Sequence, residues 1–182
     1  MIRTAIAVLL LAVAPAVVAQ SKTSTPVASN PVVSAMRQLE ERQSKNLIAA
    51  AEEMPADKYS YHPTPAQMTF AHLVILVTES NNSLCPLLAG EQERELKLSE
   101  SDSKEMLTKT LKDSFAYCEQ VLAKGDDTIL GQPVALAGGR TSTRAAALIH
   151  LASGWADHYS AAAMYLRLNN LLPPSAKKPE GK

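Results

Sequence analysis

The groups able to do chemistry in this 182-residue chain are four histidines, two cysteines and a few carboxylates. The sequence has no G-x-S-x-G, H-E-x-x-H or C-x-x-C pattern, and no glycine loop suited to binding phosphate. The common hydrolytic, redox and nucleotide sites are therefore not predicted. Any site has to be built from single histidines and acids on the faces of structural elements.

His150 and His158 lie eight residues apart in one predicted helix. Helix geometry separates them by about 12 Å along the axis and about 80° around it, which is too far for one shared ion. A three-histidine face would need a histidine at position 154, where the chain has Gly154. For His158, beside Asp157, we weigh a metal ligand or base against a packed histidine bonded to a neighbour, and we favour the second.

His72 and Glu79 share one stripe of another predicted helix, on the flank of its apolar face. A histidine and a carboxylate that project into a bundle would suit a divalent metal such as zinc, nickel or manganese. Amphipathic helices also place polar residues on their flanks by default. A solvated flank is the alternative that we favour for both residues.

Cys85 and Cys118 fall in two different predicted helices. An even pair of cysteines in an exported protein favours a disulfide. Closing that loop stabilises a fold by about 4 kcal/mol in the chain-entropy account. A reactive thiol is the weaker alternative, because neither cysteine has a basic neighbour or a C-x-x-C partner to lower its pKa.

Four amphipathic helices are predicted to position these groups. Asn30 is the expected N-cap of the first helix, Thr69 of the second, and Ser101 or Ser103 of the third. Apolar residues at helical spacing then give helices over about 31–54, 70–89, 103–125 and 141–170. With residues 125–139 as a long surface connection, no convincing strand and no internal repeat, we predict an all-α fold, a single four-helix bundle.

The N-terminus has the pattern of a cleaved signal peptide. Arg3 precedes an apolar run from Ala5 to Val18, and small residues up to Ala19 mark the cleavage position. The run is shorter than the roughly 20 apolar residues of a membrane span, so no transmembrane anchor is expected after cleavage. We predict an exported bacterial protein, periplasmic or secreted, with four segments: signal peptide 1–19, flexible leader 20–29, bundle 30–175 and disordered tail 176–182.

The composition bears on partners. Eighteen basic and eighteen acidic residues give a formal net charge of zero, so bulk charge does not favour nucleic acid or an anionic membrane. With 46% hydrophobic residues, the chain is long enough to bury the core of one ordinary domain. The partner is left as an unknown small molecule or a protein of the cell envelope, and a homodimer stays open.

Several segments resemble the DinB-like family. They are Glu53–Tyr59, Pro63–Pro65, Thr69–Ala71 and, above all, His158-Tyr159 with Tyr165–Asn169 and Pro173-Pro174. The resemblance extends over about residues 30–175. It implies a four-helix bundle with a long crossover between helices two and three or three and four. It also implies, for many members, a divalent metal held by three histidines, and the family includes metal-dependent thiol transferases.

The resemblance assigns the three ligand positions of the family to Leu76, Gly154 and His158. Only His158 can bind a metal through its side chain, so the family site is degenerate in this chain. A relocated site would use one of two other pairs, His72 with His158 or Glu79 with His150. Each pair is short of the three or four protein ligands of a tight zinc site.

Two functions from different classes follow. The first is an exported DinB-like protein with a degenerate metal site that binds a small ligand or a protein without turnover. The alternative is a divalent-metal-dependent hydrolase or thiol S-transferase that uses the relocated histidines around a metal-bound water. A structural envelope protein without a pocket is a third reading.

Overall fold

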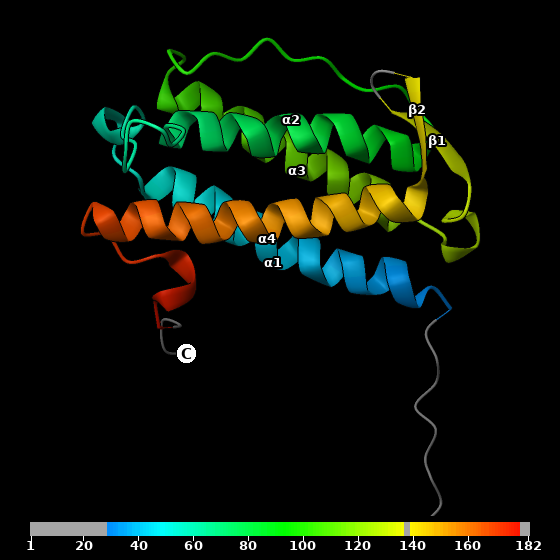
Figure 1. The fold of residues 1–182 in the computed structure, drawn as a ribbon. Coiled ribbons are helices and arrows are strands. Elements are labelled where there is room, and N and C mark those ends of the chain that lie inside the picture. Colours follow the sequence, from blue (N-terminus) through cyan, green and yellow to red (C-terminus); the bar gives the residue numbers. More distant parts are fainter. Residues whose placement is uncertain (1–28, 137–138, 179–182) are drawn as a thin grey trace, which may run out of the picture.

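The computed structural model describes residues 29–136 and 139–178. The predicted signal peptide, nearly all of the predicted leader and the end of the predicted tail lie outside these residues. Four long helices make up the molecule (Figure 1): α1 (Pro31–Glu53), α2 (Phe70–Ala89), α3 (Lys104–Ala123) and α4 (Arg144–Leu168). They confirm the predicted bundle. Among the described residues, no helix is long and apolar enough to cross a membrane.

α1 stands diagonally opposite α2 in the bundle, and α3 diagonally opposite α4. α1 packs on α3 and α4, and α2 packs on the same two helices. α2 and α3 run in the same direction, because Asn81 contacts Ser114 and Cys85 contacts Cys118 one turn further along both helices. The chain between them must therefore return along the whole bundle (Figure 1). This places the long crossover between helices two and three.

The crossover, residues 90–103, is fastened to the outside of α2 and α3. The Arg94 backbone N–H donates to the Asn82 carbonyl at 2.9 Å. Its guanidinium lies 3.5 Å from the centre of the Tyr117 ring, and Tyr117 Oη donates to Glu91 at 2.7 Å. Leu98 packs against the core. A charged segment without helix or strand is thus held in a defined path.

Side-chain caps explain where three of the helices begin. The hydroxyls of Thr69, Ser103 and Thr143 each accept a hydrogen bond from a backbone N–H in the first turn of α2, α3 and α4. The first two are N-caps that the sequence predicts. Gly90 ends α2 with φ 78°, the left-handed conformation that favours glycine at a helix C-terminus.

The first helix is capped from a distant part of the chain. Asn30 makes no side-chain cap, contrary to the prediction. The carboxylate of Asp127 instead accepts from Val32 N at 2.8 Å and Val33 N at 2.9 Å, while Asn30 Oδ1 accepts from Asp127 N at 3.0 Å. A full negative charge suits the positive end of the helix dipole better than an amide does. By accepting from the Asp127 backbone N–H, Asn30 helps to hold the Asp127 carboxylate at the start of α1.

A small hairpin corrects the prediction that the fold has no strand. β1 (Pro133–Leu136) pairs antiparallel with β2 (Arg140–Thr143), with Pro133 opposite Thr143 and Leu136 opposite Arg140. Each strand has four residues and the glycines around them resemble a surface turn, so alternation could not reveal the pair. Because β2 takes up residues 141–143, α4 begins later than predicted.

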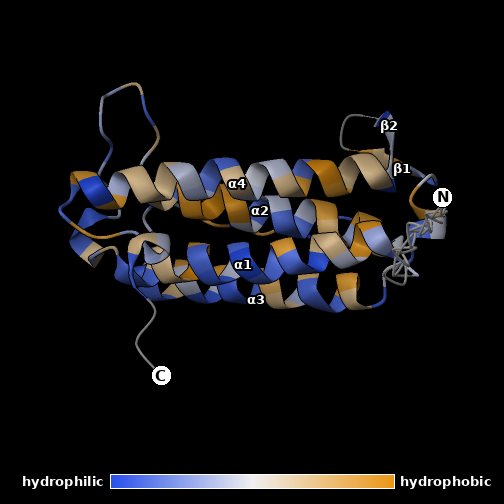
Figure 2. Ribbon diagram, turned by 90° about the horizontal axis from the view of Figure 1, so that it is seen from below, coloured by the Kyte–Doolittle hydropathy of each residue, from blue (hydrophilic) through white to orange (hydrophobic). Residues whose placement is uncertain are grey.

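The core contains one fully buried amide, Asn81. Its Oδ1 accepts from Trp155 Nε1 at 2.7 Å, and its Nδ2 donates to Ser114 Oγ at 3.0 Å. The Ser114 hydroxyl in turn donates to the Leu111 carbonyl at 2.7 Å. One polar group thus joins α2, α3 and α4. Figure 2 shows hydrophobic stretches on α2 and many hydrophilic residues along α1 and α3.

The predicted disulfide is confirmed. Cys85 of α2 and Cys118 of α3 are bonded, with their Cα atoms 5.3 Å apart, and both residues are fully buried. The bond lies one helical turn beyond the contact between Asn81 and Ser114. It therefore ties together the two parallel helices that the crossover separates in sequence.

A second polar residue lies on the core side of α1. Glu40 is 5% exposed and follows Met36 on the same buried stripe. Burial is the main cause that raises the pKa of Glu40 to about 7; the nearby charge of Glu119 adds to the rise, and the Ser44 hydroxyl opposes it. The folded protein therefore keeps the Glu40 proton at pH values where the unfolded chain has lost it.

Loss of the disulfide should destabilise the fold. The double variant Cys85→Ala, Cys118→Ala is expected to lower the free energy of unfolding by about 2–5 kcal/mol in denaturant titration, because the unfolded chain regains its freedom. Mass spectrometry after alkylation should show two fewer free thiols without reductant than with it. Two cysteines that alkylate freely in the unreduced protein would contradict the bond.

The buried Glu40 should make stability depend on pH. As pH rises from the ordinary value of 4.5 to about 7, the unfolded chain binds fewer protons than the folded one, so the free energy of unfolding should fall. The loss is on the order of 3 kcal/mol at most. Glu40→Gln, which cannot ionise, should remove this part of the slope, whereas Asp113→Asn, at an exposed site on α3, should not. Equal slopes in the wild type and Glu40→Gln would refute the assignment.

Candidate functional site

His158 lies half buried on the flank of α4 that faces α2. Tyr165, seven residues further on the same flank, donates from its hydroxyl to the Met68 carbonyl at 2.6 Å. α2 and α4 run antiparallel, so a step from Tyr165 back to His158 on α4 corresponds to a step of about seven residues forward from Met68 towards α2. His158 therefore lies at about the level of Leu76. Burial lowers the pKa of His158, with Asp157 acting in the opposite direction. Burial thus favours the neutral form of the ring.

The three positions that the resemblance assigns to metal ligands do not fit a metal. Leu76 is a half-buried apolar side chain. Gly154 has no side chain, and a Cβ placed there would meet no atom within 4 Å. Only His158 supplies a nitrogen. Within residues 29–136 and 139–178, no group of three or more His, Cys, Asp and Glu side chains could hold a metal ion.

His72 has a partner that the sequence analysis did not identify. Its Nδ1 is 2.9 Å from Oε1 of Glu100, and the Thr69 hydroxyl donates to the other oxygen of that carboxylate. The bond from Thr69, followed by the interaction with His72, lowers the pKa of Glu100. Glu100 belongs to the crossover, 28 residues away, so no local pattern could have pointed to it. The Nδ1 bond leaves Nε2 of His72 as the free nitrogen.

The other predicted site residues lie on the surface. Glu79 and His150 are both exposed. The register that places Met68 beside Tyr165 sets Glu79 opposite Gly154 and offsets His150 from it by about one helical turn. The structure therefore joins His72 to Glu100. Metal binding by His72 with His158, or by Glu79 with His150, stays a prediction.

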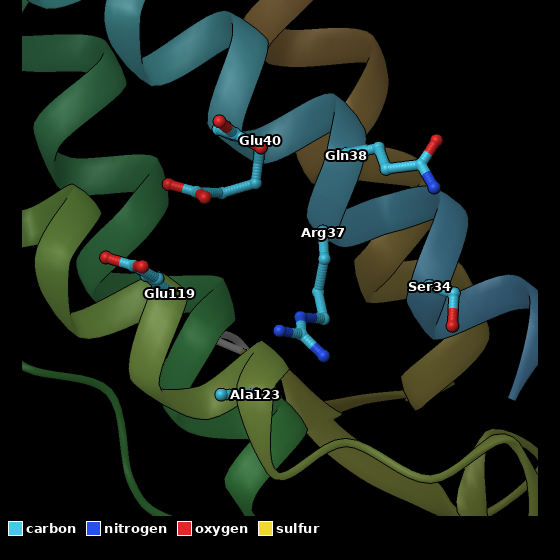
Figure 3. A pocket seen from close by; sticks show the side chains of 7 residues that line it. Ser34, Arg37, Gln38, Glu40, Glu119 and Ala123 are labelled. Atoms are coloured by element: carbon cyan, nitrogen blue, oxygen red, sulfur yellow. The ribbon is translucent and has the colours of Figure 1, made fainter.

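A polar groove of about 390 Å³ lies between α1 and α3. Figure 3 shows its side chains, with Glu40 and Glu119 across from one another on the two helices and Arg37 reaching into the same gap. The groove is lined by Arg37, Glu40, Glu41, Ser34 and Gln38 of α1 and by Glu119 of α3. The sequence analysis missed it. One indication of it was present in the sequence: Glu40 stands at a position where the helical spacing from Met36 to Leu47 predicts an apolar residue.

The charges in this groove are unpaired, with one exception. Glu41 forms an ion pair with Lys45 at 2.7 Å. Among the described residues, Arg37, Glu40 and Glu119 form no ion pair. Arg37 and Glu119 are exposed, but Glu40 is buried, and a buried carboxylate normally has a basic partner. The groove therefore combines an available guanidinium with two available carboxyl groups.

Sequence comparison identifies no relative of this chain. No family model matches it, and no curated protein matches it either. Its fold, however, matches solved structures. A DinB-like protein from Bacillus cereus ATCC 10987 is 12% identical with a TM-score of 0.63, over 78% of this chain and 95% of the other. A DinB-like protein from Bacillus subtilis is 18% identical with a TM-score of 0.64, over 80% of this chain and 99% of the other.

A mycothiol-dependent maleylpyruvate isomerase has the same fold. It is 15% identical with a TM-score of 0.58, over 70% of this chain, which spans 59% of the isomerase. Structural matches at such low sequence identity establish the fold. The function has to be argued from the residues of the site. The match extends over nearly the whole length of both DinB-like structures. The bundle with its crossover after α2 also agrees with what the resemblance implies. The chain therefore has the DinB-like four-helix fold.

Proposed function

We propose that this protein is an exported DinB-like binding module that works without a metal centre and takes a small molecule or a protein of the cell envelope. The observation that carries the proposal is the presence of Leu76 and Gly154, an apolar residue and a residue without a side chain. They occupy two of the three positions assigned to ligands, and neither can bind a metal. A bundle that keeps the fold and lacks this donor set is better suited to binding than to metal-assisted turnover.

Export is part of the proposal and rests on two independent features. The first is the charged, apolar and small-residue pattern of residues 1–19. The second is the buried bond between Cys85 and Cys118. Disulfides persist in oxidising compartments and are rare in the bacterial cytosol.

One observation favours a second candidate, a metal-dependent hydrolase or thiol S-transferase. The Glu100 carboxylate binds Nδ1 of His72 and leaves Nε2 available. Carboxylates commonly orient metal-bound histidines in this way. One solved protein of the same fold is described as mycothiol-dependent. This alternative needs a metal shared by His72 and His158.

Metal content separates the two candidates. The mature protein, purified without an affinity tag, should contain well below one equivalent of zinc, nickel or manganese by elemental analysis. Titration with each ion should give no stoichiometric binding, and His72→Ala and His158→Ala should behave like the wild type. A stoichiometric metal that disappears in His158→Ala would overturn the proposal and favour the enzyme.

Restoring the missing ligands should create a metal site. The double variant Leu76→His, Gly154→His adds two histidines at the level of His158, and the space beside Gly154 is open. We expect it to bind one equivalent of zinc and to melt at a higher temperature with zinc, since an ion that binds only the folded state stabilises it.

The control for this experiment is the same double variant carrying His158→Ala, which should lose most of the gained affinity. Gly154→His alone should bind zinc more weakly than the double variant. If the double variant folds and binds no zinc, the three positions do not converge, and the proposed loss of a family site is wrong.

A further inference from the structure

The groove between α1 and α3 holds opposite charges that do not neutralise one another. Glu40 is 5% exposed, yet no cation pairs with it among the described residues. Arg37 lies one turn earlier on α1 and reaches into the same groove (Figure 3). Without a basic partner this buried carboxyl group keeps its proton up to a pH of about 7, and its ionised form is costly in the unliganded fold. Such a group is typical of a site whose partner arrives from solution.

The lining residues restrict what that partner is. A pure anion would face Glu40, Glu41 and Glu119. A pure cation would meet the two available carboxyl groups, but also the guanidinium of Arg37. A metal ion lacks support, because the described residues contain no group of three ligating side chains. The remaining class carries both charges.

We propose that this groove binds a small zwitterion, a molecule such as a free amino acid whose ammonium lies between Glu40 and Glu119 and whose carboxylate pairs with Arg37. The inference rests on the proposed binding function and names its ligand class. An ammonium has three donors and can serve two carboxylates at once. A guanidinium matches a carboxylate with two parallel hydrogen bonds. The volume of about 390 Å³ lies within the range of small-molecule sites.

Binding of this kind should depend on pH through Glu40. The charged groups that act on Glu40 are Glu119 on α3 and Glu41 on its own helix, and Arg37 lines the same groove one turn earlier on α1. An ammonium ligand favours the ionised carboxylate. With a pKa of about 7, the ionised share of Glu40 rises about tenfold between pH 6 and pH 8. The affinity for the zwitterion should rise by a similar factor over the same interval.

The test is a titration of the mature protein with small charged molecules at pH 6 and pH 8, in which two-dimensional amide NMR detects binding. The probes are glycine and 4-aminobutanoate as zwitterions, 1,4-diaminobutane as a cation and acetate as an anion. At least one zwitterion should shift the signals of residues 37, 40 and 119 to saturation, at least tenfold more tightly than diaminobutane or acetate. Its affinity should increase about tenfold from pH 6 to pH 8.

Three variants make the result specific. Glu40→Gln and Arg37→Gln should each weaken zwitterion binding at least tenfold at pH 8, and Glu40→Gln should also abolish its pH dependence. Asp113→Asn removes an exposed charge of α3 outside the groove lining and should bind as the wild type does. Melting curves confirm that each variant is folded. Glutamine keeps the shape of Glu40, so a folded variant is expected.

Each contrary outcome overturns the inference. No saturable shift with either zwitterion, equal binding of diaminobutane or acetate, or unchanged binding in both Glu40→Gln and Arg37→Gln would each refute it. None of these bears on metal content. A metal-free protein whose groove ignores zwitterions leaves the proposed function standing, whereas stoichiometric metal overturns the proposed function whatever the groove binds.

Discussion

Asn81 is buried between three helices, where its amide oxygen and nitrogen have no water to bind. An unpartnered amide there would cost the fold several times what one good hydrogen bond contributes. Only one arrangement supplies both partners, with Trp155 of α4 and Ser114 of α3 each at its own register against α2. The disulfide one turn further on then repeats the register of α2 and α3. The parallel course of these two helices, and with it the crossover, depends on this constraint.

The crossover determines which chemistry the bundle presents. Because it follows the outside of α2 and α3, it brings the Glu100 carboxylate to His72. His158 lies on α4, one turn after Gly154 and at the level of Leu76 of α2. Of the three positions assigned to metal ligands, only His158 thus supplies a nitrogen that could bind a metal. The groove between α1 and α3 instead combines the buried Glu40 with Arg37 and Glu119.

Features set by neighbours in sequence could be predicted, and features set by distant residues could not. The four helices, the caps Thr69 and Ser103 and the glycine at Gly90 follow from periodicity and local hydrogen bonding. The disulfide followed from cysteine count and compartment. The Asp127 cap of α1 and the Glu100 partner of His72 join residues far apart in the chain, and no spacing rule reveals them. The groove at Glu40 could be predicted in part. A glutamate on an apolar stripe is visible in the sequence, but the α3 residues that lie across from it are not.

The diagonal placement of α1 with α2, and of α3 with α4, affects how the chain reaches its native state. Neither α1 with α2 nor α3 with α4 can form a helical hairpin that resembles the finished bundle, because their apolar faces meet through the other two helices. Every native helix contact therefore closes a loop of considerable length, which raises the contact order above that of an up-and-down bundle and slows folding. A chain cut after α2 would expose the apolar faces of both helices. Fragments and circular permutants should accordingly tolerate a break at 90–103 only when all four helices are present together.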